Sequence, residues 1–476
     1  MKYTFVNRAP KSKDTASVVL TDTLKDTITR TAAGRTVIEI GIGKREDMTR
    51  RKLITTIRKV VSLAKSANKK NVALPFLGFL FPRLHMLPGE LGEMLSVNLE
   101  MANFEFVKYK TKPEEGWSTL NEIIVFGKLG SVVEKAIKKG RTIGEAVNGT
   151  RMLANTPGGE MTPQILAQSA VAAALGLPIT VTVLGMREME GLGMGAVLGV
   201  GRGSDEEPKF IVMEYLPVRS QTQAGMAGGV DEQPIVLIGK GVTFDTGGLN
   251  LKSDANMYEM HMDMSGGAAV IHALVLAAQL KLKKNIVALI PAVENMPSGG
   301  SYRPGDVLRS MSGKTIEILN TDAEGRVIFA DALHYAKKYR PRLVVDVATL
   351  TGAIHVALGN HASGLFTKDQ ALEDHFRKLG EETGDYVWPM PLWDEYESEI
   401  KGTFGDWANT GKGRYGGASN AAIFLYQFTK DEKGEDAYPW VHLDIASRMT
   451  SADGEYLAKG AAGAPVRLLA RLLETY

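Results

Sequence analysis

The sequence predicts an α/β protein with a smaller N-terminal α/β domain and a larger C-terminal domain, in which helices sandwich a mixed, largely parallel sheet. Two observations support this fold class. Several short segments in the second part of the chain are almost wholly apolar, as strands covered on both faces must be. Helical segments separate these strands, which is the pattern of a parallel sheet with helices on both of its faces.

The N-terminal domain is expected to cover residues 1–130. Its segments alternate between the two-residue period of a strand and the 3.6-residue period of an amphipathic helix. The strand candidates are 35–43, 71–77 and 122–127, and the helix candidate is 46–67. No group of chemically reactive residues gathers in this part, so we expect it to support the rest of the protein.

A connecting helix and linker, residues 131–157, is expected to join the two domains. The stretch "SVVEKAIKKGRTIGEAVNGTRMLAN" has a helical pattern and ends at "TPGGEMTP", where Pro and Gly break it. The second domain should therefore cover residues 158–476.

The second domain repeats the order strand, loop, helix. Its strand candidates are 210–215, 234–240, 285–293, 315–320, 343–350 and 440–446, and its helix candidates include 265–282 and 326–338. The Gly- and Gln-rich stretch 220–233 is expected to be a surface loop. In such sheets ligands bind beyond the carboxyl ends of the strands, so the site should be sought there.

Composition and charge narrow the class of protein. The 476 residues are 44% hydrophobic and 23% charged, as in ordinary globular proteins. Lys and Arg number 56 and Asp and Glu 54, so the net charge of +2 gives no reason to expect nucleic acid or an anionic membrane as the main partner. The absence of cysteine excludes disulfides and thiolate zinc sites.

The sequence predicts a soluble cytoplasmic protein. Its first residues, "MKYTFVNRAP", lack the apolar core of a signal peptide. The longest apolar stretch, residues 266–282, carries His272 and Gln279 and is too short to span a bilayer comfortably.

Charged residues gather at the expected carboxyl ends of strands. The stretch "PIVLIGKGVTFDTGGLNLK" offers Lys240, Asp245 and Lys252, and Asp263 precedes the helix expected from about residue 265. A strand at 315–320 should then deliver three more charged groups at alternate positions of an extended backbone: Asp322, Glu324 and Arg326 of "NTDAEGR".

Four converging carboxylates would repel one another unless cations neutralise them. Two divalent ions supply +4 against −4, so a two-metal centre is the natural interpretation. The chain has no HExxH motif or histidine cluster, so the ligands must be carboxylate oxygens, with Lys240 able to join them only as a neutral amine. Such ligands tolerate Mn, Zn, Mg or Co.

Each feature also has a simpler explanation when it is taken alone. A DxExR triplet is usually a solvated turn, Lys252 could be a surface lysine, and His272 suits a packed helix. Two phosphate-binding patterns are incomplete, because Pro234 replaces the first Gly of a GxxxxGK loop and Ser204 replaces the last Gly of a dinucleotide fingerprint.

The motifs together resemble the leucyl aminopeptidase family, also called cytosol aminopeptidases or M17 metallopeptidases. The resemblance rests on "NTDAEGR", "GKGVTFDTGG" followed by Lys252, and "ENMPSGGSYRPGDVL". The stretches "RMLANTPGGEMTP", "VDVATLTGA", "HLDIA" and "GAAGAPVRLL" match further blocks in the same order, from about residue 145 to the C-terminus.

The resemblance implies a role for each matching residue. The two metal ions, Mn or Zn and possibly Mg or Co, would be held by Lys240, Asp245, Asp263, Asp322 and Glu324. Asp263 and Lys240 would belong to the more readily exchanged ion. Lys252 and Arg326 would be catalytic, with a bicarbonate ion near Arg326 acting as general base. The pocket for the P1 side chain would be lined by Met260, Asn320, Thr349, Gly352, Ala446 and Met449.

The implied activity is removal of the N-terminal residue, preferably leucine or another apolar residue, from peptides by a two-metal mechanism with a bridging hydroxide. A homohexamer is the implied assembly. Arg448, next to Met449, leaves the exact P1 preference open, and Thr246 and Ala462 also depart from common family residues without being proposed ligands.

Two other functions compete with this one. A two-metal phosphoesterase could use the same carboxylates and cations, although no histidine cluster or phosphate nest accompanies them. A non-catalytic peptide- or nucleic-acid-binding protein could keep the fold, although the complete ligand set and the near-zero net charge speak against it.

Overall fold

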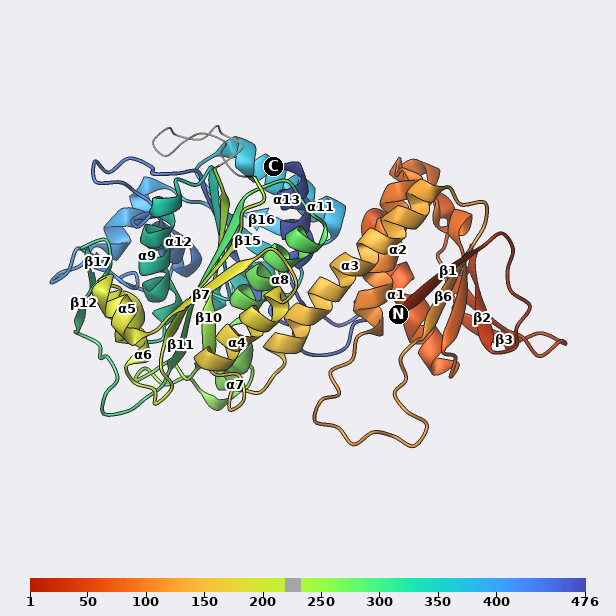
Figure 1. The fold of residues 1–476 in the computed structure, drawn as a ribbon, viewed down its shortest axis with the longest axis horizontal. Coiled ribbons are helices and arrows are strands. Elements are labelled where there is room, and N and C mark those ends of the chain that lie inside the picture. The colour runs from red at the N-terminus through yellow and green to blue at the C-terminus, as the bar shows by residue number, and fades with distance from the viewer. Residues whose placement is uncertain (219–232) are drawn as a thin grey trace. The chain divides into compact units, whose positions relative to one another are not determined.

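The computed structural model describes residues 1–218 and 233–476 (Figure 1). The expected surface loop at 220–233 lies outside these ranges, apart from its last residue. The described chain forms two compact units. The first comprises residues 1–148 together with 451–459, and the second comprises 149–450 with 460–476. Nothing in the sequence indicated that the short segment 451–459 belongs with the first unit.

The first unit contains a six-stranded sheet. Its strand order is β1 (Lys2–Val6), β6 (Glu122–Phe126), β5 (Asn71–Pro75), β2 (Thr15–Thr21), β4 (Thr36–Gly41) and β3 (Thr27–Arg30). All neighbours pair in parallel except β3 and β4. Helices α1 (Arg50–Ser66) and α2 (Pro88–Asn103) share one buried core with these strands. Helix α3 (Ser131–Ala154) continues without a break across the boundary between the units.

The second unit is built on a nine-stranded, mostly parallel sheet, which confirms the predicted fold class. Its strands in spatial order are β16 (Val387–Pro389), β15 (Ser363–Phe366), β18 (Trp440–Asp444), β14 (Leu343–Ala348), β9 (Ile235–Gly239), β11 (Ile286–Asn295), β8 (Lys209–Tyr215) and β7 (Thr180–Leu184), with β10 (Gly241–Asp245) paired to the far end of β11. The antiparallel pairs lie toward the edges, between β15 and β18 and among β11, β8 and β7.

Helices cover both faces of this sheet (Figure 1). Alternate residues of β9 show the two layers, because Ile235 and Leu237 belong to one core cluster whereas Val236 and Ile238 belong to the other. The first cluster includes residues of α4 (Pro163–Ala174), α8 (Ser265–Gln279), α11 (Gln370–Thr383) and α13 (Val466–Thr475). The second includes residues of α5 (Met186–Gly191), α6 (Gly195–Gly201), α9 (Glu324–Ala336), α10 (Gly352–Leu358) and α12 (Gly417–Tyr426). Burial on both faces explains why these strands are apolar throughout.

Glycine lets α8 begin close to the central strands. A Cβ atom on Gly266 would lie 2.1 Å from the carbonyl oxygen of Val347 in β14. Any other residue at this position would push the start of α8 away from the sheet, so the glycine fixes the depth of the loop that precedes it.

The prediction for residues 315–320 was wrong in two respects. The strand there, β13 (Thr315–Glu317), is shorter and belongs to a separate three-stranded sheet with β12 (Val307–Arg309) and β17 (Trp407–Ala408). After Glu317 the backbone no longer pairs with a neighbouring strand, because a side chain supplies its hydrogen bond instead. The side-chain oxygen of Asn409 accepts the amide N–H of Leu319 at 2.8 Å. Glu324 and Arg326 consequently lie in the first turn of α9 rather than on an extended chain.

Among the described residues, one segment, 254–279, is long and apolar enough to cross a bilayer by length and composition. It includes α7 (Asp254–Met257), the short 3-10 helix η5 (Met260–Met262) and α8. In its most apolar window 83% of the residues are buried inside the structure, as in a core helix, so the segment is weak support for a membrane span.

Candidate metal centre

Five charged residues predicted as metal ligands lie where strands end or helices begin. Lys240 directly follows β9, and Asp245 is the last residue of the neighbouring β10. Asp263 follows η5 just before α8. Asp322 lies in the turn before α9, and Glu324 is the first residue of that helix. Segments far apart in the sequence therefore meet at the carboxyl edge of the sheet.

The side chain of Lys240 is almost fully buried within this group. Its Nζ is 2.7 Å from Oδ2 of Asp263 and 2.7 Å from Oε1 of Glu324. It also donates a hydrogen bond to the carbonyl oxygen of Thr349, at 3.0 Å. Gly325 makes room for it, because a Cβ there would lie 2.7 Å from Lys240 Cε.

Lys252 joins the other two carboxylates. Its Nζ is 2.9 Å from Oδ2 of Asp245 and 2.5 Å from Oδ1 of Asp322. The loop after β10 folds back to place it there, with the amide of Lys252 donating to the carbonyl of Thr246 at 2.9 Å. Gly247 makes this reversal possible through a positive φ of 84°.

The electrostatics of the group are dominated by burial and by mutual charge. Burial raises the pKa of Asp263 to about 8 and that of Asp245 to about 6, and repulsion by Glu324 adds to both effects. Burial opposes the charge of Lys240 and Lys252, but the surrounding carboxylates outweigh it and raise both pKa values. Four acids and two ammonium groups leave a deficit of positive charge in a largely buried site.

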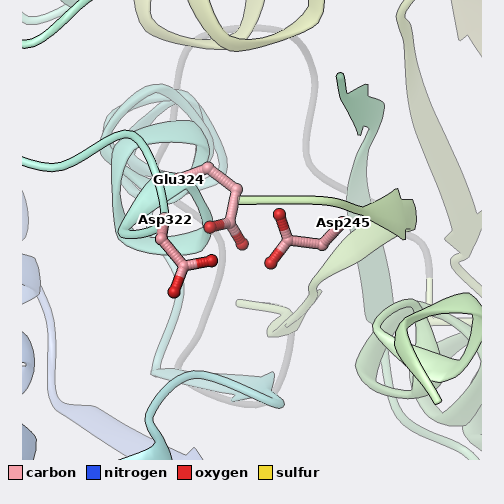
Figure 2. A group of neighbouring side chains, drawn as sticks. All are labelled: Asp245, Asp322 and Glu324. Carbon is pink, nitrogen blue, oxygen red and sulfur yellow. The ribbon is translucent and has the colours of Figure 1, made fainter. Parts of the chain in front are cut away.

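The carboxylates suit divalent cations. Asp245, Asp322 and Glu324 each offer an oxygen, and these oxygens lie within 4.8 Å of one another. Figure 2 shows the three side chains pointing toward a common space between β10 and the start of α9. Asp263 lies on the other side of Lys240 and bonds to the same ammonium group as Glu324. Four carboxylates together with one amine are ligands that suit Mn, Mg or Zn ions.

Neutral side chains fix the orientation of the acids. Asn295, the last residue of β11, donates from Nδ2 to Oδ1 of Asp245 at 2.8 Å. Thr349 donates from Oγ1 to Oδ1 of Asp263 at 2.6 Å. The role of Asn295 was missed in the sequence, although two polar residues, Glu294 and Asn295, that end a long apolar strand are the signal that could have found it.

Arg326 lies two residues after Glu324 in the first turn of α9 and is also buried. Its Nη1 donates to the carbonyl of Asn409 at 3.0 Å, whereas its Nε has no hydrogen-bond partner among the described residues. Burial lowers the pKa of Arg326 to about 10 despite attraction by Glu324, so it remains a cation at neutral pH. Within the described chain it forms no ion pair with a carboxylate, unlike Lys240 and Lys252.

Two of the six residues expected to line a P1 pocket contact the acids directly. Asn320 and Thr349 belong to the hydrogen-bond network, since Asn320 accepts the amide of Asp322 at 2.8 Å and Thr349 contacts Asp263. The other four lie at the ends of short elements: Met260 begins η5, Gly352 begins α10, Ala446 begins the 3-10 helix η8 (Ala446–Arg448), and Met449 follows it.

Asp444 ties two of these loops together. Its Oδ1 accepts the amides of Leu350 at 3.0 Å and Ala446 at 3.2 Å, and its Oδ2 accepts the hydroxyl of Thr351 at 2.7 Å. It is fully buried at the end of β18. Like Asn295, it is a polar residue at the end of a buried strand, and it was not singled out in the sequence. The guanidinium of the neighbouring Arg448 donates to the carbonyl of Asn360.

Comparisons with known proteins decide the family. A model of the cytosol aminopeptidase family, catalytic domain, matches residues 148–470. A probable cytosol aminopeptidase of Saccharophagus degradans is 42% identical over 92% of this chain and 84% of its own length. Another from Roseiflexus castenholzii is 41% identical over 93% of this chain and 87% of its own. The chain belongs to the cytosol aminopeptidase family.

A solved structure agrees with this assignment. The bottromycin maturation enzyme BotP, determined in complex with Mn, superposes with a TM-score of 0.85 at 28% identity, over 97% of this chain and 99% of the other. The predicted family is thereby confirmed, and the chain is a metal-dependent aminopeptidase, a hydrolase of the exopeptidase class. Family membership also decides against the phosphoesterase and the non-catalytic alternatives.

The fit between Gly325 and Lys240 can be tested by Gly325→Ala. The added methyl group would displace the flexible end of Lys240 from Asp263 and Glu324. We expect kcat/KM of the aminopeptidase to fall by about tenfold to a hundredfold, because small displacements in a catalytic site are costly. Steady-state hydrolysis of leucine p-nitroanilide, with Tm recorded in parallel, provides the measurement.

Gly159→Ala is the matched control, since a Cβ there meets no atom within 4 Å. Wild-type activity in Gly325→Ala would show that the position of Lys240 is not critical. A loss of activity accompanied by an equal loss of folded protein would assign the effect to stability instead.

Proposed function

We propose that this aminopeptidase removes leucine and other apolar N-terminal residues from peptides with the help of two divalent metal ions per chain, Mn or Zn. The ions would be held by Lys240, Asp245, Asp263, Asp322 and Glu324. The observation that carries the proposal is the convergence of four carboxylates on two lysines at one edge of the sheet.

Charge explains why the site would hold more than one cation. Four carboxylates carry −4, and Lys240 and Lys252 supply +2 when both are protonated. Lys240 would have to lose its proton to act as a ligand, which makes the need for metal charge greater. When bound, two divalent ions supply a water nucleophile that ionises near neutral pH and polarise the peptide carbonyl.

Lys252 is proposed to stabilise the negative charge that develops on the carbonyl oxygen of the substrate. Its side chain is mostly buried, and its ammonium group is held by Asp245 and Asp322. Because these acids raise its pKa, Lys252 stays protonated and can donate hydrogen bonds to an oxyanion.

Arg326 is proposed to hold a bicarbonate ion. Its buried Nε–H has no acceptor among the described residues, and an anion at this position would satisfy it. Bound there, bicarbonate would supply a base close to the reacting groups. Arg326 itself would orient this anion and keep it charged.

The preference for apolar residues would come from the pocket lined by Met260, Asn320, Thr349, Gly352, Ala446 and Met449. Methionine side chains adapt to several apolar shapes, so the preference would be broad. One methylene in such a pocket changes the activation free energy by about 1–3 kcal/mol. The guanidinium of Arg448 donates a hydrogen bond to the carbonyl of Asn360. This contact supports a pocket in which the guanidinium does not face the substrate.

The protein is further proposed to form a homohexamer in the cytoplasm. The support for this is the family resemblance together with the names of the relatives, which are probable cytosol aminopeptidases.

Lys252→Ala tests the proposed oxyanion contact. We expect kcat for leucine p-nitroanilide to fall about a hundredfold or more, as when an oxyanion donor is removed, while the metal content is retained. Lys283→Ala, an exposed lysine in the same unit, serves as control. Unchanged turnover in Lys252→Ala would remove this residue from the mechanism.

Asp444→Ala tests whether the two loops shape the pocket. The amides of Leu350 and Ala446 would lose their shared acceptor, which costs about 1–3 kcal/mol for each buried donor left unsatisfied. We expect the ratio of kcat/KM for leucine over alanine p-nitroanilide to fall severalfold, with metal content unchanged. Equal losses for both substrates would instead indicate a general structural role.

Metal analysis of the purified full-length chain tests the two-metal proposal directly. We expect about two divalent ions per chain, loss of peptidase activity on chelation, and recovery with Mn or Zn. Asp263→Asn should retain about one ion, because it removes a proposed ligand of the exchangeable ion only. Full activity in a chain with no bound metal would refute the proposal.

A further inference from the structure

A cavity rich in lysine lies at the opposite end of α9 from the carboxylates. Its volume is about 740 Å³, within the range of small-molecule sites. Its lining includes five lysines and a histidine: Lys314, Lys337, Lys338, Lys430, Lys433 and His334. Apolar side chains such as Leu192 and Met311 line the rest.

The cavity has an excess of positive charge. The five lysines face two acids of the lining, Asp431 and Glu432, which leaves +3 with His334 neutral. Asp431 is already engaged, because its Oδ1 accepts the amides of Lys433 and Glu435 at 2.8 and 2.9 Å. Lys430 pairs with Glu397 outside the lining, at 3.3 Å.

Lys314 and Lys337 are half-buried lysines of this lining, and acids such as Asp406 and Asp431 attract them only at longer range. Among the described residues neither forms an ion pair with a carboxylate. Burial lowers the pKa of Lys337 to about 8, and repulsion by Lys314 contributes. The pKa of Lys314 is also lowered, by burial first and then by Lys430. His334 is kept neutral, with its pKa lowered to about 4 by burial and by both lysines.

The backbone holds these two ammonium groups in place. Lys314 donates to the carbonyl of Gln427, and Lys337 donates to the carbonyl of Lys430. Each ammonium group has three donors, so others remain for a ligand. Two half-buried, repelling cations are therefore fixed by the chain that surrounds them, an arrangement that an anion would stabilise.

We propose that this cavity binds a phosphate-bearing small molecule through Lys314 and Lys337. Two fixed ammonium groups match the two or more charges of a phosphate monoester or a polyphosphate. The lining has lysines and no arginine, which favours a tetrahedral oxyanion approached from several directions over the paired oxygens of a carboxylate. The apolar side chains leave room for an organic group attached to the phosphate.

The site is separate from the metal centre. Glu324 and Arg326 lie in the first turn of α9, whereas His334 and Tyr335 of the cavity lie in its last turn (Figure 1). At about 1.5 Å per residue these turns are roughly 15 Å apart along the helix. The cavity ligand is therefore not the peptide substrate, and the proposal does not depend on the P1 preference or on the number of metal ions.

Competition with an amine-acylating reagent tests the proposal on the wild-type, metal-loaded protein. Modification of single lysines is followed by mass spectrometry, with inorganic pyrophosphate as the probe and succinate at matched ionic strength as the carboxylate comparison. At a pyrophosphate concentration about ten times Kd, we expect Lys314 and Lys337 to be modified about tenfold more slowly. The exposed Lys135 and Lys283 should be unaffected.

A variant separates the cavity from the metal ions, which can also bind pyrophosphate. In Lys314→Ala/Lys337→Ala, calorimetry should show pyrophosphate binding weakened about tenfold or more, whereas the control Lys135→Ala/Lys283→Ala loses the same charge and should bind as wild type. Equal modification rates with and without pyrophosphate would overturn the proposal. Protection by succinate as strong as that by pyrophosphate would overturn the choice of phosphate.

Discussion

The catalytic unit depends on one buried interaction, the contact of the Lys240 ammonium with Asp263 and Glu324. These residues come from the end of β9, the loop before α8 and the start of α9. Their carboxylates would not be ionised in a dry interior without a cation between them. The packing of α8 and α9 on the sheet therefore brings the end of β9, the loop before α8 and the start of α9 together. Gly266 allows α8 to approach β14 closely, and Gly325 allows α9 to approach the Lys240 side chain.

The same interaction explains why the centre calls for metal ions. Lys240 and Lys252 neutralise only half of the charge on the four acids, and burial raises the pKa of Asp245 and Asp263 accordingly. Divalent cations relieve this cost, so metal binding should stabilise the folded unit as well as activate it. Asn295 and Thr349 orient the acids, because each holds one oxygen of a carboxylate whose other oxygen faces the ammonium group of Lys252 or Lys240.

Much of this arrangement could be predicted from the sequence for physical reasons. Segments such as 234–240 and 343–350 are apolar because both faces of the sheet are covered, and the carboxyl-end rule then places Lys240 and Asp245 together. The strand at 315–320 was misjudged because its apolar alternation gave no sign that the Asn409 side chain satisfies the backbone from 89 residues away. Asn295 and Asp444 were missed because a single polar residue is weak information until its partners are known.

Helix α9 has the metal centre at its first turn and the lysine cavity at its last turn. The positive end of a helix favours anions and its negative end favours cations. Glu324 lies in the first turn of α9, while Lys337 and Lys338 follow its last turn in the 3-10 helix η6 (Lys337–Tyr339). The lysines are thus partly stabilised by the helix that also supports the acids. A dianion bound at the lysines would compete with that stabilisation only weakly, because the dipole effect is confined to the terminal turns. Coupling between the two sites would therefore have to pass through movement of α9 itself, which its fully buried face resists.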